Sequence, residues 1–274
     1  MNTPTRVGLV LGAGGESGAS FIRAALTEIE SITGWRPSTA QTIIGTSIGA
    51  LISARLGPAD STSTGLESAD LESATDGLRH LAANIPGPSS RVTDLLTVPS
   101  RRLGGRVVAL VVPSGRYVAD YPIGEPPHHS GASVVSVARP LGSRRVTRLV
   151  DAKSPGQELY ASAAVPGFSA NVLLDGRRHI DGAVHSSTNA DLISPDDHDL
   201  LVVIAPLVAI SGASALARSH RALLMRELAP WRKAKKPTLV LAPSREQYRS
   251  RSSLEASAEA ALGQLRRASP GVGS

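Results

Sequence analysis

The sequence predicts an α/β fold with three layers, α/β/α, around a mostly parallel central sheet. Short aliphatic runs alternate with segments of helical periodicity, which is the order typical of parallel strands joined by helices. Aromatic residues make up only 3% of the 274 residues, so Ala, Val, Leu and Ile must supply most of the core. These residues also suit strands that are buried on both faces. The length is sufficient for one large domain, and we expect a single domain over residues 1–274.

The N-terminal part predicts strand, helix, strand and helix in that order. Residues 7–11 are a short apolar strand, and a helix over about 18–32 follows a glycine-rich loop. The apolar stripe of this helix is Phe21, Ile22, Ala25, Leu26 and Ile29. Residues 42–44 indicate the end of a second buried strand, and residues 48–56 form a helix that stops at Gly57-Pro58.

The middle segment, residues 57–132, is predicted to be a divergent, insertion-like region. Its polar first part is expected to grade into a helix that contains Leu78 and Leu81. Residues 107–112 then predict a strand. His128-His129 resembles a metal-binding pair but has no third ligand nearby, so we expect no metal site.

The second half predicts further strands, a hairpin and two helices. Asp175-Gly176 is a two-residue hairpin signal between residues 172–174 and 177–180. The other expected strands are 133–138, 200–205 and 238–241, the helices are about 214–228 and 253–267, and residues 268–274 are expected to be a disordered tail.

Composition and charge exclude several classes of function. The chain has no cysteine, which excludes disulfides, a thiolate nucleophile and thiolate metal ligands. The formal net charge of +6 permits contact with anionic lipid, but the basic residues are scattered without interleaved aromatics, so we expect no nucleic-acid partner. The first residues are unlike a secretory signal, and the longest apolar run, 200–210, is too short to cross a bilayer. We therefore expect a cytoplasmic protein.

The stretch "IIGTSIGAL", residues 43–51, has the G-x-S-x-G spacing of a nucleophile elbow. Gly45 and Gly49 flank Ser47 where a strand turns sharply into a helix. Such a turn presents the serine hydroxyl clear of the chain, next to the unpaired N–H groups of the helix N-terminus. A tight turn that carries an incidental serine is the alternative interpretation.

The loop "LGAGGESG" after the first strand is a candidate oxyanion-binding site. It contains Gly12, Gly14, Gly15 and Gly18, and backbone N–H groups at such a strand-to-helix turn converge on anions. Gly14 and Gly15 are the best donors. The loop lacks the Gly-Lys-Ser/Thr of a P-loop, and Ser17 stands where a dinucleotide fingerprint would need a glycine. A purely structural turn remains an alternative.

Asp181 is the best candidate for a general base. It begins Asp-Gly-Ala at the exit of the predicted hairpin, where Gly182 permits a tight bend beside a ligand. A common Asp-Gly turn is the alternative. His185, His198 and His220 follow Ser47 as an α/β-hydrolase triad requires, but in that fold the nucleophile comes after several strands, whereas here it ends the second.

The glycine loop, G-x-S-x-G and D-G-A, in this order, resemble the patatin-like phospholipase family. The likeness covers residues 7–56 and 133–205, and is loose over 57–132 and the C-terminal third. It implies a patatin-like α/β fold and a lipid acyl hydrolase in which Ser47 is the nucleophile and Asp181 its base. The implied substrate is a lipid or fatty acyl ester cleaved through an acyl-enzyme, with the oxyanion bound by Gly14 and Gly15 and no metal or organic cofactor.

The sequence departs from that family in ways that bear on the substrate. Ala13 replaces the first glycine of the family's G-x-G-x-x-G frame, and Ser17 replaces a basic residue, which makes a neutral ester or a thioester more plausible. Ser187 and Asn189 stand where prolines are often found. A catalytically silent lipid- or partner-binding relative, or an acyltransferase with a histidine partner, are the alternatives. The basic balance and the apolar stretch 206–215 offer a candidate for peripheral membrane contact, but a core strand end followed by a loop is the favoured interpretation of this stretch.

Overall fold

The computed structural model describes residues 5–56, 76, 78–84, 114, 133–140, 146–149, 155–208 and 215–243. Its strands are β1 (Val7–Leu11), β2 (Thr42–Thr46), β3 (Ser133–Pro140), β4 (Val146–Leu149), β5 (Val172–Leu174), β6 (Arg177–Asp181), β7 (Leu200–Ile204) and β8 (Thr238–Leu241). Its α-helices are α1 (Gly15–Thr33), α2 (Ile48–Ser53), α6 (Pro155–Ser162), α7 (Ala215–Glu227) and α8 (Ala229–Ala234), and its 3-10 turns are η1 (Pro37–Thr39), η3 (Gly182–Val184) and η4 (Ala190–Leu192).

The described strands form one sheet in the order β5-β6-β3-β2-β1-β7-β8, and β4 also pairs with β3. Strands β3, β2, β1, β7 and β8 run parallel to one another. The antiparallel pairs lie at one end of the sheet, where β3 pairs with β4 and β6, and β6 pairs with β5. The carboxyl ends of β1, β2 and β7 therefore meet at one edge, the usual place for a site in a parallel sheet.

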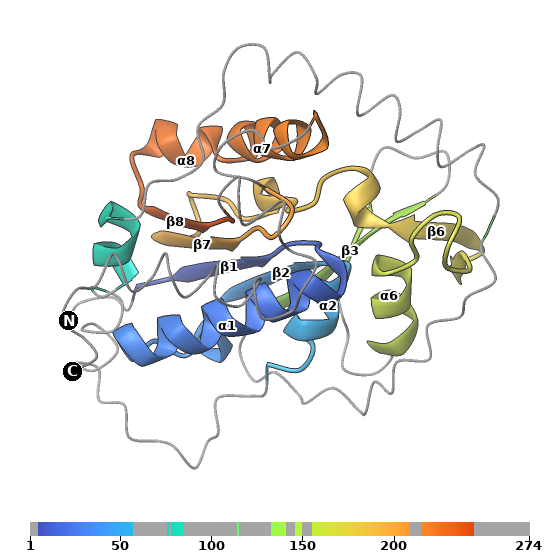
Figure 1. The fold of residues 1–274 in the computed structure, drawn as a ribbon, viewed down its shortest axis with the longest axis horizontal. Helices are drawn as coiled ribbons and strands as arrows, with labels where there is room; N and C mark the ends of the chain where they lie inside the picture. The colour runs from blue at the N-terminus through green and yellow to red at the C-terminus, as the bar shows by residue number, and fades with distance from the viewer. Residues whose placement is uncertain are drawn as a thin grey trace.

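Helices cover both faces of this sheet, with α1 and α2 on one side and α7 and α8 on the other (Figure 1). Side chains alternate along the central strands because successive residues point to opposite faces. Leu9 and Leu11 of β1 pack in the core with α1, whereas Val10 packs in the core with α7 and α8. The predicted three-layer fold with a mostly parallel sheet is confirmed.

Most expected elements lie where the periodicity places them, and the differences are at their ends. Helix α1 begins at Gly15, three residues before the predicted start. The prediction missed this first turn because it lacks the apolar stripe from which the helix was predicted. Helix α2 ends at Ser53, whose hydroxyl turns back to the Ala50 carbonyl oxygen at 2.8 Å. The hairpin of β5 and β6 has the expected turn, with positive φ at Asp175 (47°) and Gly176 (72°).

Three described elements were not predicted: β4, α6 and α8. They are short, and their apolar residues have no clear periodicity of their own. Helix α8 starts just after α7 with Pro230 in its first turn and ends at Ala234, and the next residue, Lys235, has a left-handed conformation.

Several predictions concern residues outside the described ranges: the strand at 107–112, the pair His128-His129, the helix at 253–267 and the tail at 268–274. The expected helix around Leu78 and Leu81 is present at 78–84, and both leucines are fully buried in the core with α1. The single domain over residues 1–274 stays a prediction. None of the helices in the described ranges has the length and apolar character that a bilayer crossing requires.

The favoured interpretation of 206–215 as a core strand end is confirmed for its described start, residues 206–208. Pro206 and Val208 are buried. Val208 packs in the core with α7 and α8, whereas Pro206 lies beside Gly18 of α1.

Candidate active site

Ser47 lies in the sharp turn between β2 and α2, with φ 56° and ψ −123°. A non-glycine residue in this backbone region is strained, at a cost of about 1–3 kcal/mol, and such residues cluster at functional sites. The two flanking glycines are required by close contacts. A methyl group on Gly49 would collide with the carbonyl oxygen of Leu11, and one on Gly45 would lie 2.7 Å from the Ala50 nitrogen. The G-x-S-x-G segment therefore forms the predicted elbow, packed directly on the end of β1.

A hydrogen bond from helix α6 supports the elbow. The N–H of Ser47 donates to Oγ of Ser162 at 3.0 Å, and Ser162 is fully buried at the C-terminal end of α6. This bond fixes the position of the main-chain nitrogen of Ser47, next to the carbon from which its side chain extends. Sequence reasoning missed Ser162, and no spacing signal marks it, because the contact joins segments that are distant in the chain.

Asp181 is the last residue of β6, and its side chain meets that of Ser47. Its N–H donates to the carbonyl oxygen of Ala164 at 2.9 Å, which fixes the strand exit. Its carboxyl group accepts from the N–H of Ala183 at 2.7 Å, and the neighbouring Ser47 side chain influences its pKa. The two predicted residues are thus brought together, although β3 lies between β2 and β6 in the sheet.

The environment of Asp181 changes its acidity. Burial raises the pKa of Asp181 to about 6, against the opposing effects of the Ala183 N–H and the neighbouring Ser47 side chain. The side chain is only 3% exposed, and Ser47 is 9% exposed. A carboxylate with little hydration holds a proton more readily, so Asp181 is a stronger base than an aspartate in water.

The glycine loop presents unused backbone donors at the N-terminus of α1. The N–H of Gly12 donates to Ile204 O at 2.9 Å, and the N–H of Ala13 donates to Ser187 O at 2.8 Å. Within the part of the chain that the structure describes, the amides of Gly14 and Gly15 have no acceptor. Gly15 has φ 62°, which bends the chain into the helix. The role of the Gly14 and Gly15 amides in holding an anion stays a prediction, and the N–H of Gly18 donates to Gly14 O at 3.1 Å in the first turn of α1.

The segment after Asp181 contacts both the elbow around Ser47 and the glycine loop. Gly182 is buried and begins η3. Further along, Asn189 donates from Nδ2 to the hydroxyl of Thr46 at 3.1 Å, next to the elbow. The carbonyl group of Ser187 holds the glycine loop, as described above. The segment 182–190 therefore sets the position of the elbow and of the loop at once.

A buried carboxyl group anchors this turn from α7. Oε2 of Glu227 accepts from the Thr188 hydroxyl at 2.6 Å and from the Ala190 N–H at 2.9 Å. Burial raises the pKa of Glu227 to about 7, and the neighbouring charge of Asp191 adds to the increase. Sequence reasoning missed Glu227, because in the sequence it is one more polar residue of an amphipathic helix.

None of the candidate histidines is hydrogen-bonded to Ser47, whose N–H donates to Ser162. His198 lies near the opposite end of β2, with Nε2 2.9 Å from the Thr42 hydroxyl and Nδ1 3.1 Å from Ser194 O. His220 is buried on α7, and His185 follows η3. Among the described residues, no group of three or more His, Asp or Glu side chains has an arrangement that could hold a metal ion.

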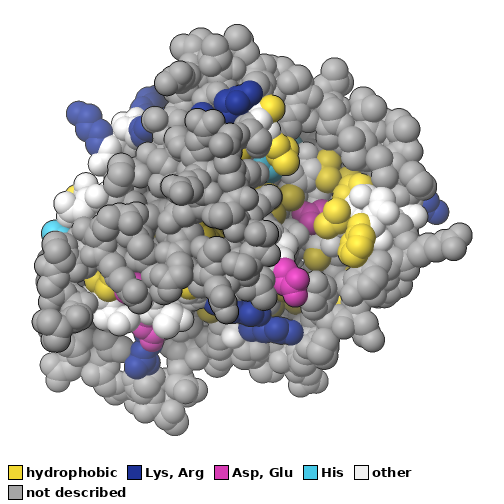
Figure 2. All heavy atoms as spheres, in the orientation of Figure 1, with side chains coloured by type: hydrophobic (Ala, Val, Ile, Leu, Met, Phe, Trp, Pro, Cys, Tyr) yellow, Lys and Arg dark blue, Asp and Glu magenta, His cyan; other side chains and the backbone are white. Residues whose placement is uncertain are grey.

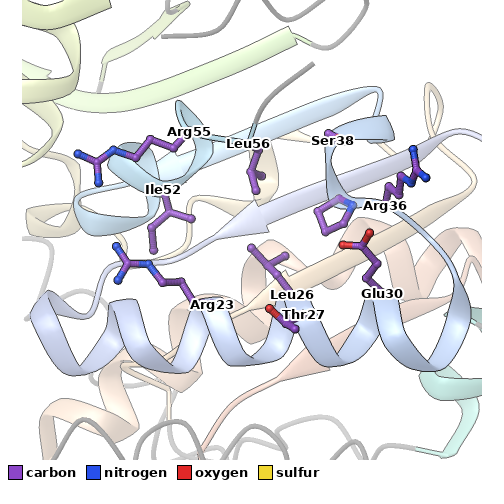
Figure 3. Close-up of a pocket in the computed structure, with 10 residues that line it drawn as sticks. Arg23, Leu26, Thr27, Glu30, Arg36, Ser38, Ile52, Arg55 and Leu56 are labelled. Atoms are coloured by element: carbon purple, nitrogen blue, oxygen red, sulfur yellow. The ribbon is translucent and has the colours of Figure 1, made fainter. Parts of the chain in front are cut away.

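A separate cavity of about 360 Å³ opens beside α1 and the end of α2 (Figure 3). Leu26 and Ile52 lie on its apolar side, and three arginines, Arg23, Arg36 and Arg55, stand around it. None of the predicted site residues lines this cavity. It is distinct from the Ser47 and Asp181 pair.

Comparison with known proteins agrees with the geometry. The family model described as Patatin-like phospholipase matches residues 9–193. The matched range contains the glycine loop, Ser47, Ser162 and the segment that begins at Asp181. A search of the curated proteins finds no match.

Proposed function

Because the chain belongs to the patatin-like phospholipase family, we propose that it is a serine lipid acyl hydrolase that uses a Ser47-Asp181 dyad. The observation that carries the proposal is the placement of the Ser47 side chain beside the buried carboxyl group of Asp181, where it influences the pKa of that carboxyl. A serine hydroxyl is a poor nucleophile near neutral pH and needs an adjacent base, which this contact supplies.

The proposed reaction is acyl transfer to water in two steps. Asp181 takes the Ser47 proton as Oγ attacks the ester carbonyl carbon, and the Gly14 and Gly15 amides hold the oxyanion. Collapse of this intermediate breaks the ester bond, and the leaving alcohol takes the proton from Asp181. Water then attacks the acyl-enzyme, gives a proton to Asp181 and releases the fatty acid, while Ser47 recovers its proton.

The acidity of Asp181 supports its role as the base. With a pKa of about 6, Asp181 is largely ionised at neutral pH and holds a proton better than an ordinary aspartate. A general base works best when its pKa lies near the working pH, and a positioned base contributes roughly 100- to 10,000-fold.

The proposed substrate is a fatty acyl ester. The glycine loop carries Ser17 instead of a basic residue, so the proposal includes neutral esters and thioesters beside phospholipids. The cytoplasmic location expected from the sequence stays a prediction.

Labelling with a fluorophosphonate probe tests the dyad. We expect the wild-type protein to be labelled, and Ser47→Ala and Asp181→Asn to lose the label while remaining folded. Asp175→Asn is the matched control, because it makes the same chemical change at an exposed turn of the same hairpin and should keep the label. A folded wild-type protein that is not labelled would favour the catalytically silent alternative.

Substitution of histidines tests the acyltransferase alternative. His185→Ala, His198→Ala and His220→Ala should each keep the label, since none of these side chains is hydrogen-bonded to Ser47. Loss of label in a folded histidine variant would contradict the Ser-Asp dyad. Hydrolysis of p-nitrophenyl esters of graded chain length, beside a phospholipid panel and with Ser47→Ala as the blank, would then define the preferred acyl group.

A further inference from the structure

Large hydrophobic side chains are exposed on the segment that follows α6. Phe168 is 61% exposed, Leu173 is 60% exposed and Val165 is 43% exposed. Phe168 is one of two phenylalanines in the chain, and the other, Phe21, is buried under the sheet. Single exposed apolar residues need no explanation, but a group of them beside a candidate site indicates an interaction surface.

This segment begins at the reacting groups and then reaches the surface. Ser162 accepts the N–H of Ser47, and Ala164 accepts the N–H of Asp181. Val165 and Phe168 come one and four residues after Ala164, in a turn closed by the hydrogen bond from the Phe168 N–H to Val165 O at 3.1 Å. The exposed side chains are therefore close to the candidate dyad.

The hairpin of β5 and β6 adds the third hydrophobic side chain and a positive charge. Ala161 packs against Val172 and Leu174, which brings the start of β5 back to the end of α6. Leu173 points away from this packing and pairs with Arg178 across the hairpin. Directly opposed residues share one face of a sheet, so the exposed guanidinium group of Arg178 stands beside Leu173.

Figure 2 shows hydrophobic side chains gathered around a hollow, on the side of the molecule where Figure 1 places α6 and β6. Aromatic and aliphatic groups beside a cationic group on a long stem are the combination that binds at a membrane interface. The apolar parts enter the acyl boundary, and the charge pairs with anionic headgroups.

We propose that Val165, Phe168, Leu173 and Arg178 form a docking surface that seats the site on an anionic lipid surface. This inference rests on the proposed function, because a lipid hydrolase has a reason to carry apolar residues beside its dyad. It replaces the stretch 206–215 as the candidate contact, because the described start of that stretch is buried. The net charge of +6 also attracts the protein to an anionic lipid surface, over a longer range than the contacts of these four residues.

Vesicle co-sedimentation tests the docking surface without catalysis. The measurement uses the full chain with Ser47→Ala, so that no lipid is hydrolysed, and vesicles of phosphatidylcholine with and without phosphatidylglycerol. We expect partition onto the anionic vesicles that weakens in high salt. Phe168→Ala should lower the partition coefficient about tenfold, and Arg178→Ala about fivefold.

Arg23→Ala is the matched control for Arg178→Ala. Arg23 is exposed on α1, so its substitution removes the same charge from another face and should leave partition unchanged. Circular dichroism and thermal unfolding check that each variant is folded. The exposed position of Phe168 and Arg178 makes loss of the fold an unexpected result.

Two results would overturn the docking surface. One is partition that Phe168→Ala and Arg178→Ala leave unchanged, or that Arg23→Ala weakens equally. The other is a dimer in solution that Phe168→Ala converts to a monomer, because the surface would then contact a second copy of the chain. Failure of fluorophosphonate labelling would contradict the dyad alone, since vesicle binding is measured in a protein without Ser47.

Discussion

The side chain of Ser47 lies beside the carboxyl group of Asp181 and influences its pKa, although β3 separates β2 from β6 in the sheet. Three local arrangements make this contact. The elbow turns Ser47 out of β2, the N–H of Asp181 is held by Ala164 O, and the Ala183 N–H orients the carboxyl group. The pair lies in a nearly closed site, and its burial sets the chemistry of the carboxyl group.

The activity should depend on pH through Asp181. Its pKa is raised to about 6, and only the ionised form can accept the Ser47 proton. We therefore expect kcat/KM for a soluble ester to rise with pH up to about 6 and to level off above it, with a tenfold loss per pH unit well below the pKa. A profile that stays flat down to pH 4.5 would contradict the role of Asp181.

Ser162→Ala should impair the elbow more than it impairs substrate binding. The change leaves the Ser47 N–H without its buried acceptor, which should lower the free energy of unfolding by about 1–3 kcal/mol. We expect kcat to fall more than tenfold with little change in KM, because the hydroxyl loses its fixed direction. Ser169→Ala is the control, since its hydroxyl makes a longer contact of 3.5 Å with Ala163 O. Equal effects of both substitutions on kcat would argue against a specific role for Ser162.

Glu227→Gln should change how stability depends on pH. The pKa of Glu227 is about 7 in the folded protein, against a reference value of 4.5, so the folded state binds the proton more tightly than the unfolded state. Its contribution to stability is complete below pH 4.5 and is lost as pH rises through 7. Relative to wild type, the variant should gain on the order of 3 kcal/mol between pH 4.5 and 8.

Urea unfolding at several pH values measures this difference. The glutamine carbonyl can still accept from Thr188, so the turn should keep its position. Glu16→Gln, at an exposed site in the first turn of α1, controls for the chemical change. If the difference between Glu227→Gln and wild type is independent of pH, the raised pKa of Glu227 is wrong.

Two helical Gly→Ala substitutions should have opposite effects on stability. Gly49→Ala places a methyl group against the backbone of Leu11 and should lower the free energy of unfolding by about 3 kcal/mol or more. Gly18→Ala places its methyl group in ordinary contact with Pro206 at 3.4 Å. Because alanine favours helix, this variant should be as stable as wild type or more stable by up to about 1 kcal/mol. Denaturant unfolding of the two variants checks the packing of α2 on the end of β1.

The sequence by itself determined the layered α/β fold, the elbow around Ser47, the glycine loop and the hairpin that ends at Asp181. These features depend on local rules. Side chains alternate along a strand, turns need particular residues at fixed positions, and a glycine at Gly49 permits a close approach that other residues prevent. A short segment therefore carries enough information to predict each of them.

The tertiary structure alone decided the contacts of Ser162, the anchoring of the 182–190 turn by Glu227, and the raised pKa of Asp181. It also decided the short elements β4, α6 and α8, which form where neighbouring elements pack against them. The physical reason is that desolvation and long-range hydrogen bonds depend on what surrounds a group, not on the residues beside it in the chain. Asp181 belongs to an ordinary Asp-Gly turn signal in the sequence, and its burial is what raises the pKa of its carboxyl group to about 6.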